Sequence, residues 1–340
     1  MGDAGTGTGT EDFERRIDSY RTELFAHCYR MLGSVHDAED LVQDTYLRAW
    51  RAREQYDERR ASVRTWLYRI ATNACLTALA GRERRPLPSG LVEQGEDPAQ
   101  PFVHGGEVPW LQPVPDALLG PAPRDPAAAA AERASLRLAF LAALQHLSAR
   151  ERATLVLREV LQFSATEAAE ILDTTAAGIN SALQRARARL AEAAVAEDGL
   201  AESTEPELRL WVERYVESFE KADLDGLKRL LAADVVLEMP PMVNWYVGPE
   251  RYTGFIARVF TMRGTNWRMV PVGANRQPAI AAYVYDDGCY RLHTVQVFDF
   301  GQDGVRRNTA YQNPEAFAAF DLAPVLEAGP SSAPSKRASA

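Results

Sequence analysis

The sequence predicts a multidomain fold class, with two all-α domains, the second a helix-turn-helix, followed by an α+β domain. Three observations lead to this prediction. Apolar side chains recur at helical spacing in residues 13–85 and again in residues 147–193. A stretch rich in proline and glycine, residues 86–131, separates these two parts. From residue 205 onward, amphipathic helices give way to β-rich runs divided by turn residues. A chain of 340 residues is long enough for two or three such domains.

Residues 147–193 are expected to form three short helices. Ser148 with Glu151, and Ser164 with Glu167, match the capping box that begins a helix. The last helix carries an apolar stripe of Ile179, Leu183, Ala186 and Leu190. Its other faces carry the polar residues Asn180, Ser181, Gln184, Arg185 and Arg187. A short helix, a turn and a second helix with outward amide and guanidinium groups are typical of major-groove reading. An ordinary helical hairpin, whose arginines complement the helix dipole, remains the alternative.

The first domain contains two helices with functional candidates. The helix expected at 37–50 buries one stripe and leaves an acidic face, which an ordinary solvated helix would also do. The helix expected at 63–79 has a core face of Val63, Leu67, Ile70 and Ala74. A second face carries Trp66, Arg69 and Asn73, side chains suited to stacking on unpaired bases and reading their edges. Burial of Trp66 in the core is the alternative, but arginines dominate residues 59–85.

Composition and charge limit the functions that the chain can have. No apolar run is long enough to span a bilayer, and Met1–Glu11 is unlike a signal peptide. Cys28, Cys75 and Cys289 lack metal-ligand spacing and are expected to be buried free thiols in a reducing cytoplasm. No motif implies a metal or an organic cofactor. The net charge of −9 argues against unaided binding to duplex DNA, so a DNA-reading role requires a larger assembly that supplies positive charge.

The third unit is expected to begin after Glu197–Gly199. An amphipathic helix over 211–219 precedes a second helix at 250–260 and three β-rich runs at 267–273, 278–285 and 290–300. Turns are expected at 286–288 and 301–304. Helices followed by an antiparallel sheet predict an α+β domain.

Two segments resemble a known family closely. Residues 147–193, including the NSALQRARARL of the last helix, resemble region 4 of the extracytoplasmic-function (ECF) group of sigma-70 family factors. The segment DAEDLVQDTYLRAW, residues 37–50, is similar to the region 2 helix by which this family docks on core RNA polymerase. The third unit resembles SnoaL-like domains in its overall pattern. The order of the three units is that of SigG-like ECF sigma factors with a SnoaL-like extension.

The resemblance implies a set of domains and contacts. The domains are sigma region 2 at 11–85, an acidic linker at 86–131, sigma region 4 at 132–197 and a SnoaL-like cone at 205–327. Expected polymerase contacts are Asp37, Asp40, Gln43, Asp44, Leu47 and Trp50. Expected contacts to the minus-ten element are Trp66, Arg69 and Asn73, and those to the minus-thirty-five element are Thr175, Asn180, Ser181, Gln184, Arg185 and Arg187. The family's linker threads the polymerase cleft, and the apolar segment WLQPVPD, residues 110–116, is expected to dock onto a protein surface.

These expectations describe a cytoplasmic alternative sigma factor that is not an enzyme. Its expected partners are core RNA polymerase and promoter DNA, with no membrane. The SnoaL-like domain is expected to modulate activity by contacting the sigma domains or the linker, and a small-molecule ligand is a further candidate partner. The rival hypothesis is a helix-turn-helix regulator fused to a SnoaL-like enzyme or ligand sensor. Candidates for such an enzyme are Asp234, Glu238, His293 and Asp299, with Tyr283, Tyr285 and Trp245 as pocket walls.

Overall fold

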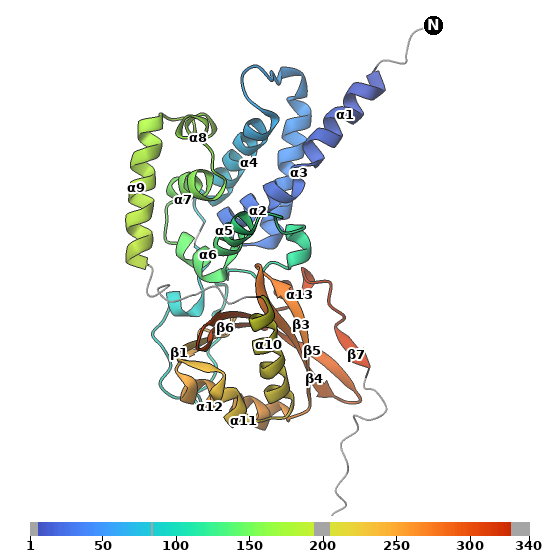
Figure 1. Ribbon diagram of the computed structural model, residues 1–340, viewed down its shortest axis with the longest axis vertical. Helices are drawn as coiled ribbons and strands as arrows, with labels where there is room; N and C mark the ends of the chain where they lie inside the picture. The colour runs from blue at the N-terminus through green and yellow to red at the C-terminus, as the bar shows by residue number, and fades with distance from the viewer. Residues whose placement is uncertain (1–5, 83, 194–204, 328–340) are drawn as a thin grey trace, which may run out of the picture. The chain divides into compact units, whose positions relative to one another are not determined.

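The computed structural model describes residues 6–82, 84–193 and 205–327, and the chain divides into two compact units (Figure 1). The first unit comprises residues 1–85 and 111–196, and the second comprises residues 86–110 and 197–340. The proline-rich linker is therefore shared between the units, with the change falling between Trp110 and Leu111. The predicted boundary at 197 and the segment Glu197–Gly199 lie outside the described residues.

The first unit is helical. Its N-terminal part consists of α1 (Thr6–Asp18), α2 (Arg21–Leu32), α3 (Val35–Arg51), the short 3₁₀ turn Arg53–Gln55 and α4 (Val63–Leu79). Local sequence sets these boundaries. Gly33 ends α2 in the left-handed conformation at φ 67°, which a side chain would disfavour. The hydroxyls of Ser34 and Ser62 then accept the N–H groups of Asp37 and Thr65 and cap α3 and α4.

The C-terminal part of the first unit contains the helix-turn-helix. Its elements are α5 (Pro126–Leu136), α6 (Leu138–Leu144), α7 (Ala149–Leu155), the π-turn Val156–Val160, α8 (Ala165–Leu172) and α9 (Ala176–Ala193). Both predicted capping boxes are confirmed, at the starts of α7 and α8. Ile179, Leu183 and Ala186 are buried as predicted. The π-turn was not predicted, because the side-chain pattern of Val156–Val160 does not distinguish it from an α-helical turn.

The second unit is built on one mixed sheet (Figure 1). Its strands are β1 (Leu231–Glu238), β2 (Trp245–Val247), β3 (Trp267–Ala274), β4 (Gln277–Asp286), β5 (Cys289–Gly301), β6 (Gly304–Tyr311) and β7 (Val325–Glu327). The strand order is β2-β1-β6-β5-β4-β3, and β7 pairs with β5. The three predicted β-rich runs are confirmed as β3, β4 and β5. The prediction of an antiparallel sheet is wrong at one pairing, since β1 and β6 are parallel. These two strands are far apart in sequence, so no local pattern indicated their pairing.

Helices cover one face of this sheet. They are α10 (Glu205–Glu220), α11 (Leu224–Arg229) and α12 (Pro249–Arg263), and a short helix α13 (Pro314–Ala318) follows β6. The predicted amphipathic helix is α10, whose Tyr215 and Phe219 are buried in the core. The ring of Tyr215 meets that of Phe298 on β5 at 4.8 Å, edge to face. No helix among the described residues is long and apolar enough to cross a membrane.

Linker residues Val92–Gly105, which we call the strap, bind to the second unit through backbone groups. The indole of Trp245 donates to the carbonyl of Val92 at 2.9 Å, and the N–H of Gly95 donates to the carbonyl of Trp245 at 2.8 Å. Arg258 on α12 donates to the carbonyls of Pro98 and Gln100 at 2.7 and 2.5 Å. Further contacts include those from Val103 to Asn244, from Asn244 to Pro101 and from Gly105 to Pro241. The strap is thus an ordered part of the second unit.

Candidate nucleic-acid interface

Helix α9 presents three uncommitted polar side chains. Asn180, Ser181 and Gln184 are exposed, and none makes a side-chain hydrogen bond or ion pair within the described part of the chain. The helix begins at a capped turn, where Thr175 Oγ1 accepts the N–H of Gly178 at 3.1 Å. The amide side chains can donate to and accept from base edges without first breaking internal contacts.

The arginines of α9 are already paired. Arg185 lies 3.4 Å from Glu151, Arg189 also pairs with Glu151, and Arg187 lies 2.5 Å from Glu159. Although burial opposes it, hydrogen bonds from Ser148 and Arg185 and the positive charge of Arg189 hold the pKa of Glu151 below its usual value. The guanidinium groups of Arg185 and Arg187 nevertheless remain 60% and 62% exposed, so both can still reach a phosphate.

Helix α4 carries the predicted single-strand face. Arg69 and Asn73 are exposed, whereas Trp66 is only partly so. The ring of Trp66 lies 4.8 Å from that of Tyr56 and 6.2 Å from that of Phe13. The predicted line of three side chains therefore consists of two exposed groups and one edge of an aromatic cluster, which the sequence pattern did not indicate.

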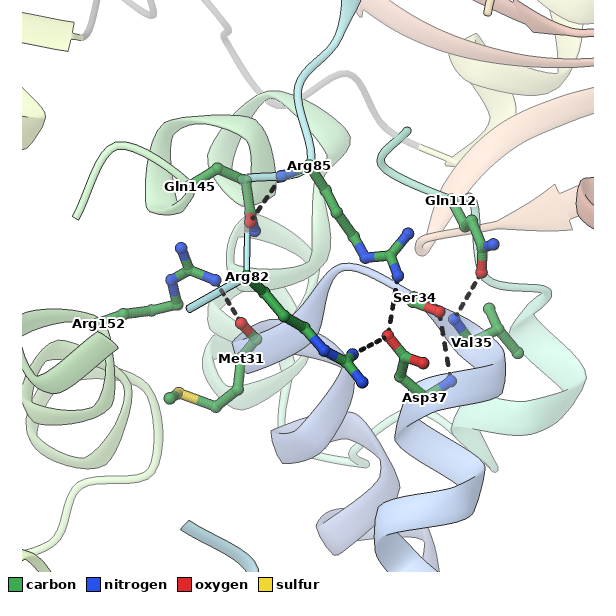
Figure 2. A network of polar contacts seen from close by, with 9 residues as sticks. All are labelled: Met31, Ser34, Val35, Asp37, Arg82, Arg85, Gln112, Gln145 and Arg152. Atoms are coloured by element: carbon green, nitrogen blue, oxygen red, sulfur yellow. Dashed lines mark hydrogen bonds and ion pairs between the residues drawn. The ribbon is translucent and has the colours of Figure 1, made fainter. Parts of the chain in front are cut away.

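Helix α3 carries the predicted polymerase contacts. Asp40, Gln43 and Leu47 are exposed, and 55% exposure is unusual for a leucine in a packed helix. The remaining three are partly engaged. Asp44 pairs with Arg48 at 2.8 Å, and Arg53 lies 4.4 Å from the ring of Trp50. Asp37 accepts from both Arg82 and Arg85, at 2.9 and 2.8 Å (Figure 2).

The comparisons with known proteins identify the family. Residues 16–85 match Sigma-70 region 2, residues 137–190 match Sigma-70, region 4, and residues 212–307 match the SnoaL-like domain. The chain is 44% identical over 313 residues to ECF RNA polymerase sigma factor SigG of Mycobacterium tuberculosis, covering 92% of this chain and 84% of SigG. The protein is an ECF sigma factor. It therefore directs core RNA polymerase to promoters, and its family is not one of enzymes.

Two further similarities agree with this assignment. The sigma factor is 27% identical over 249 residues to SigJ of Mycobacterium tuberculosis, covering 71% of this chain and 70% of SigJ. The crystal structure of SigJ from the same organism superposes with a TM-score of 0.61 at 22% identity, covering 91% of this chain and 99% of SigJ. This likeness shows that the two chains share their fold.

Regions 2 and 4 of the sigma factor pack together in the first unit, which the sequence did not predict. The ring of Tyr68 on α4 lies 5.1 Å from that of Phe163, in the turn that follows the π-segment. Arg64 stacks 4.3 Å above the same Phe163 ring. A cavity of about 560 Å³ opens beside this contact, lined by Arg60 and Arg69 of region 2 and by Thr166, Glu170, Asp173, Thr174 and Ala176 of region 4. Candidate residues from both DNA-reading regions therefore lie close to the same cavity.

Three of the four candidate enzyme residues of the SnoaL-like domain are paired with other polar side chains of the domain, and the fourth, His293, packs against an aromatic ring. Glu238 is fully buried, pairs with Arg307 at 2.6 Å and accepts the N–H of Ser89. Asp234 lies 3.5 Å from Arg306, and Gln277 donates to Asp299 at 2.7 Å. Burial lowers the pKa of His293 to about 4, and its ring packs against Trp267. Of the proposed walls, Tyr283 and Tyr285 pack near Tyr290, and Trp245 binds the strap.

The interior of the SnoaL-like domain instead contains a polar network that the sequence analysis missed. Tyr215 and Tyr252 share a hydrogen bond of 2.8 Å between their hydroxyls, and Asn308 donates to Tyr252 at 2.7 Å and to Gln296 at 2.9 Å. Burial raises the pKa of Tyr252 to about 12, so its hydroxyl stays protonated. These groups come from α10, α12, β5 and β6, and only the tertiary fold brings them together.

All three cysteines are free thiols, and Cys28 and Cys75 are buried as predicted. Cys289 is only partly buried, because it opens β5 directly after a turn. Within residues 6–82, 84–193 and 205–327, no three His, Cys, Asp or Glu side chains gather as a metal-binding group.

Proposed function

We propose that three exposed surfaces carry out promoter recognition in this sigma factor. In this proposal α3 binds core polymerase through Asp40, Gln43 and Leu47, α4 reads the minus-ten element, and α9 reads the minus-thirty-five element. The observation that carries the proposal is that Asn180, Ser181 and Gln184 on α9, the proposed recognition helix, are exposed and make no side-chain hydrogen bond or ion pair within the described residues. The net charge of −9 agrees with binding as a polymerase subunit in the cytoplasm, since polymerase can supply the positive charge that DNA requires.

Promoter binding requires the two sigma regions to separate. The minus-ten and minus-thirty-five elements are about 25 base pairs apart, which at 3.4 Å per step is about 85 Å of duplex. In the first unit, Arg69 of region 2 and Ala176, the first residue of α9, line the same cavity of about 560 Å³. One promoter cannot reach both reading surfaces in this arrangement. The compact form is therefore proposed to be the free state, which opens on polymerase.

The SnoaL-like domain is proposed to modulate the sigma factor by holding the strap. The family's linker threads the polymerase cleft, and the strap cannot occupy the cleft and the second unit at once. Binding of the strap by Trp245, Arg258 and Asn244 then stabilises the free state relative to the polymerase-bound state. In this role the polar side chains inside the domain stabilise its fold: Glu238 pairs with Arg307, and Tyr215, Tyr252 and Asn308 bond to one another.

In vitro transcription tests the proposal. The full-length protein is mixed with core RNA polymerase and a duplex template that carries its cognate promoter, without any other sigma factor. We expect initiation from that promoter. A requirement for a second sigma factor would instead favour a conventional helix-turn-helix regulator.

A further inference from the structure

The turn between α2 and α3 receives both ends of the linker segment 86–110. Arg85, directly before this segment, donates from its side chain to Asp37 and from its backbone N–H to Gln145, at 2.8 and 3.4 Å. Gln112, just after the segment, contacts Gly33 and Val35 of the same turn. Figure 2 shows the contacts of Arg85 with Asp37 and Gln145, and that of Gln112 with Val35, around the first turn of α3. We call Arg85, Gln112 and the turn Gly33–Asp37 the linker anchor.

Gln112 is held at three polar groups. Its backbone N–H donates to the carbonyl of Gly33 at 3.0 Å, and its carbonyl accepts from the hydroxyl of Tyr29 at 2.6 Å. Its side-chain Oε1 accepts the N–H of Val35 at 2.9 Å. That N–H belongs to the first residue of α3 and has no partner within the helix, so a linker side chain completes the cap that Ser34 begins. Gln112 itself is 8% exposed.

Close packing makes this site specific for the linker. Leu111 and Val114 are fully buried. A Cβ atom at Gly33 would lie 2.8 Å from Cδ1 of Leu111, so the absence of a side chain at Gly33 lets the linker approach the turn. Trp110, the last linker residue of the second unit, is buried and packs over Gly105. A Cβ atom at Gly105 would clash with its indole ring. Consecutive linker residues are thus fixed in different units.

We propose that the linker anchor couples polymerase binding at α3 to release of the linker. Asp37 is a predicted polymerase contact whose Oδ2 already accepts from Arg82 and Arg85. Basic groups of the polymerase that approach Asp37 compete with Arg85 for its carboxylate. This competition loosens the N-terminal end of segment 86–110. Gln112 holds the C-terminal end of the segment. The linker can enter the polymerase cleft only after both ends are free. The coupling rests on the proposed docking role of α3, whereas the anchor itself does not.

Hydrogen exchange and binding to core polymerase, both on the full-length protein, test the proposal. Gln112→Leu keeps the side-chain size but removes the acceptor, and we expect amide exchange at Val35 and across 111–119 to accelerate on the order of tenfold. In the proposal, the contact between Gln112 and Val35 exists in free sigma factor and is broken on polymerase. Gln112→Leu therefore destabilises only the free state, and affinity for core polymerase should rise by a similar factor. Gln112→Glu, which keeps an acceptor oxygen, should restore slow exchange. Gln100→Leu makes the same change at an exposed position in the strap and should alter neither measurement.

The two measurements separate the possible failures. Unchanged exchange in Gln112→Leu would overturn the anchor. Faster exchange with unchanged or weaker polymerase affinity, at an unchanged melting temperature, would overturn the coupling. A failure of the docking role proposed for α3 gives a different result, namely full polymerase binding by Asp40→Arg. This variant leaves the Gln112 contacts intact.

Discussion

The Glu151 side chain links α7 of region 4 to α9, the proposed recognition helix. It caps α7 together with Ser148 and accepts from Arg185 and Arg189 on α9. A carboxylate with 6% side-chain exposure would be costly to leave unpaired. Replacement of Arg185 therefore changes stability as well as DNA contact, and a clean test of DNA reading must use a neighbour without internal partners.

Gln184→Ala provides that test. We expect transcription from the cognate promoter to fall about 5- to 150-fold, because a good base contact contributes about 1–3 kcal/mol. Core polymerase binding and the melting temperature should stay unchanged, since the side chain is exposed. Gln302→Ala, an exposed position in the turn between β5 and β6, is the matched control. Wild-type transcription by Gln184→Ala would move base reading to another residue.

His27 makes the stability of region 2 depend on pH. Burial, together with the nearby charges of Arg30 and Arg64, lowers the pKa of His27 to about 3 from 6.5. In the unfolded chain His27 binds a proton below pH 6.5, whereas in the folded chain it does so only below about pH 3. The free energy of unfolding therefore falls as the pH drops from 6.5 to 3. We expect a loss of about 2 kcal/mol between pH 6.5 and pH 5.

Urea unfolding at pH 7 and pH 5 checks this prediction. The wild-type midpoint should fall more between these pH values than that of His27→Gln, which cannot titrate. Parallel shifts in the two proteins would assign the pH dependence to other groups.

At the scale of elements, α3 is the surface with the most direct test. Asp40→Arg should abolish co-purification with core polymerase, because it reverses an exposed charge on the proposed docking face. The helical signal and melting temperature should not change, since exposed carboxylates contribute little to stability. Glu213→Arg makes the same charge change on exposed α10 and should bind normally. If Asp40→Arg retains wild-type affinity, the docking surface lies elsewhere.

The sequence predicted those elements whose signals are local. Ser148 with Glu151, and Ser164 with Glu167, fixed the starts of α7 and α8 because each capping box spans four residues. Parallel pairing of β1 with β6 depends on contacts between distant residues, and no local pattern carries it. The linker's composition predicted an extended chain. It could not reveal the surface that binds it, because Trp245 and Arg258 come from a domain far along the sequence.

At the scale of the whole molecule, truncation after Ala196, a position outside the described residues, tests the SnoaL-like domain. We expect the truncated protein to keep core binding and to initiate more transcription, because the strap loses the contacts that hold it in the free state. Limited proteolysis should cleave 86–110 faster in the truncated protein than in the full chain. Lower transcription after truncation would instead mean that the domain supports the open complex.

Asn244→Leu is the matched variant that leaves the domain in place. Asn244 accepts the N–H of Val103 and donates to the carbonyl of Pro101, so its loss weakens the strap at two points. Transcription should shift in the same direction as after truncation, by a smaller factor. A change of transcription in the opposite direction would mean that the SnoaL-like domain does not act by holding the strap.

The distribution of strap contacts has a kinetic consequence. Its hydrogen bonds are spread along the segment from Val92 to Gly105, and most of them involve backbone groups. Such a segment can peel away from one end, breaking one or two bonds at a time, whereas a compact interface must break many together. The barrier to release is then much smaller than the total strength of the strap. A sigma factor built in this way can hold its linker firmly at equilibrium and still release the strap quickly once the linker anchor has opened.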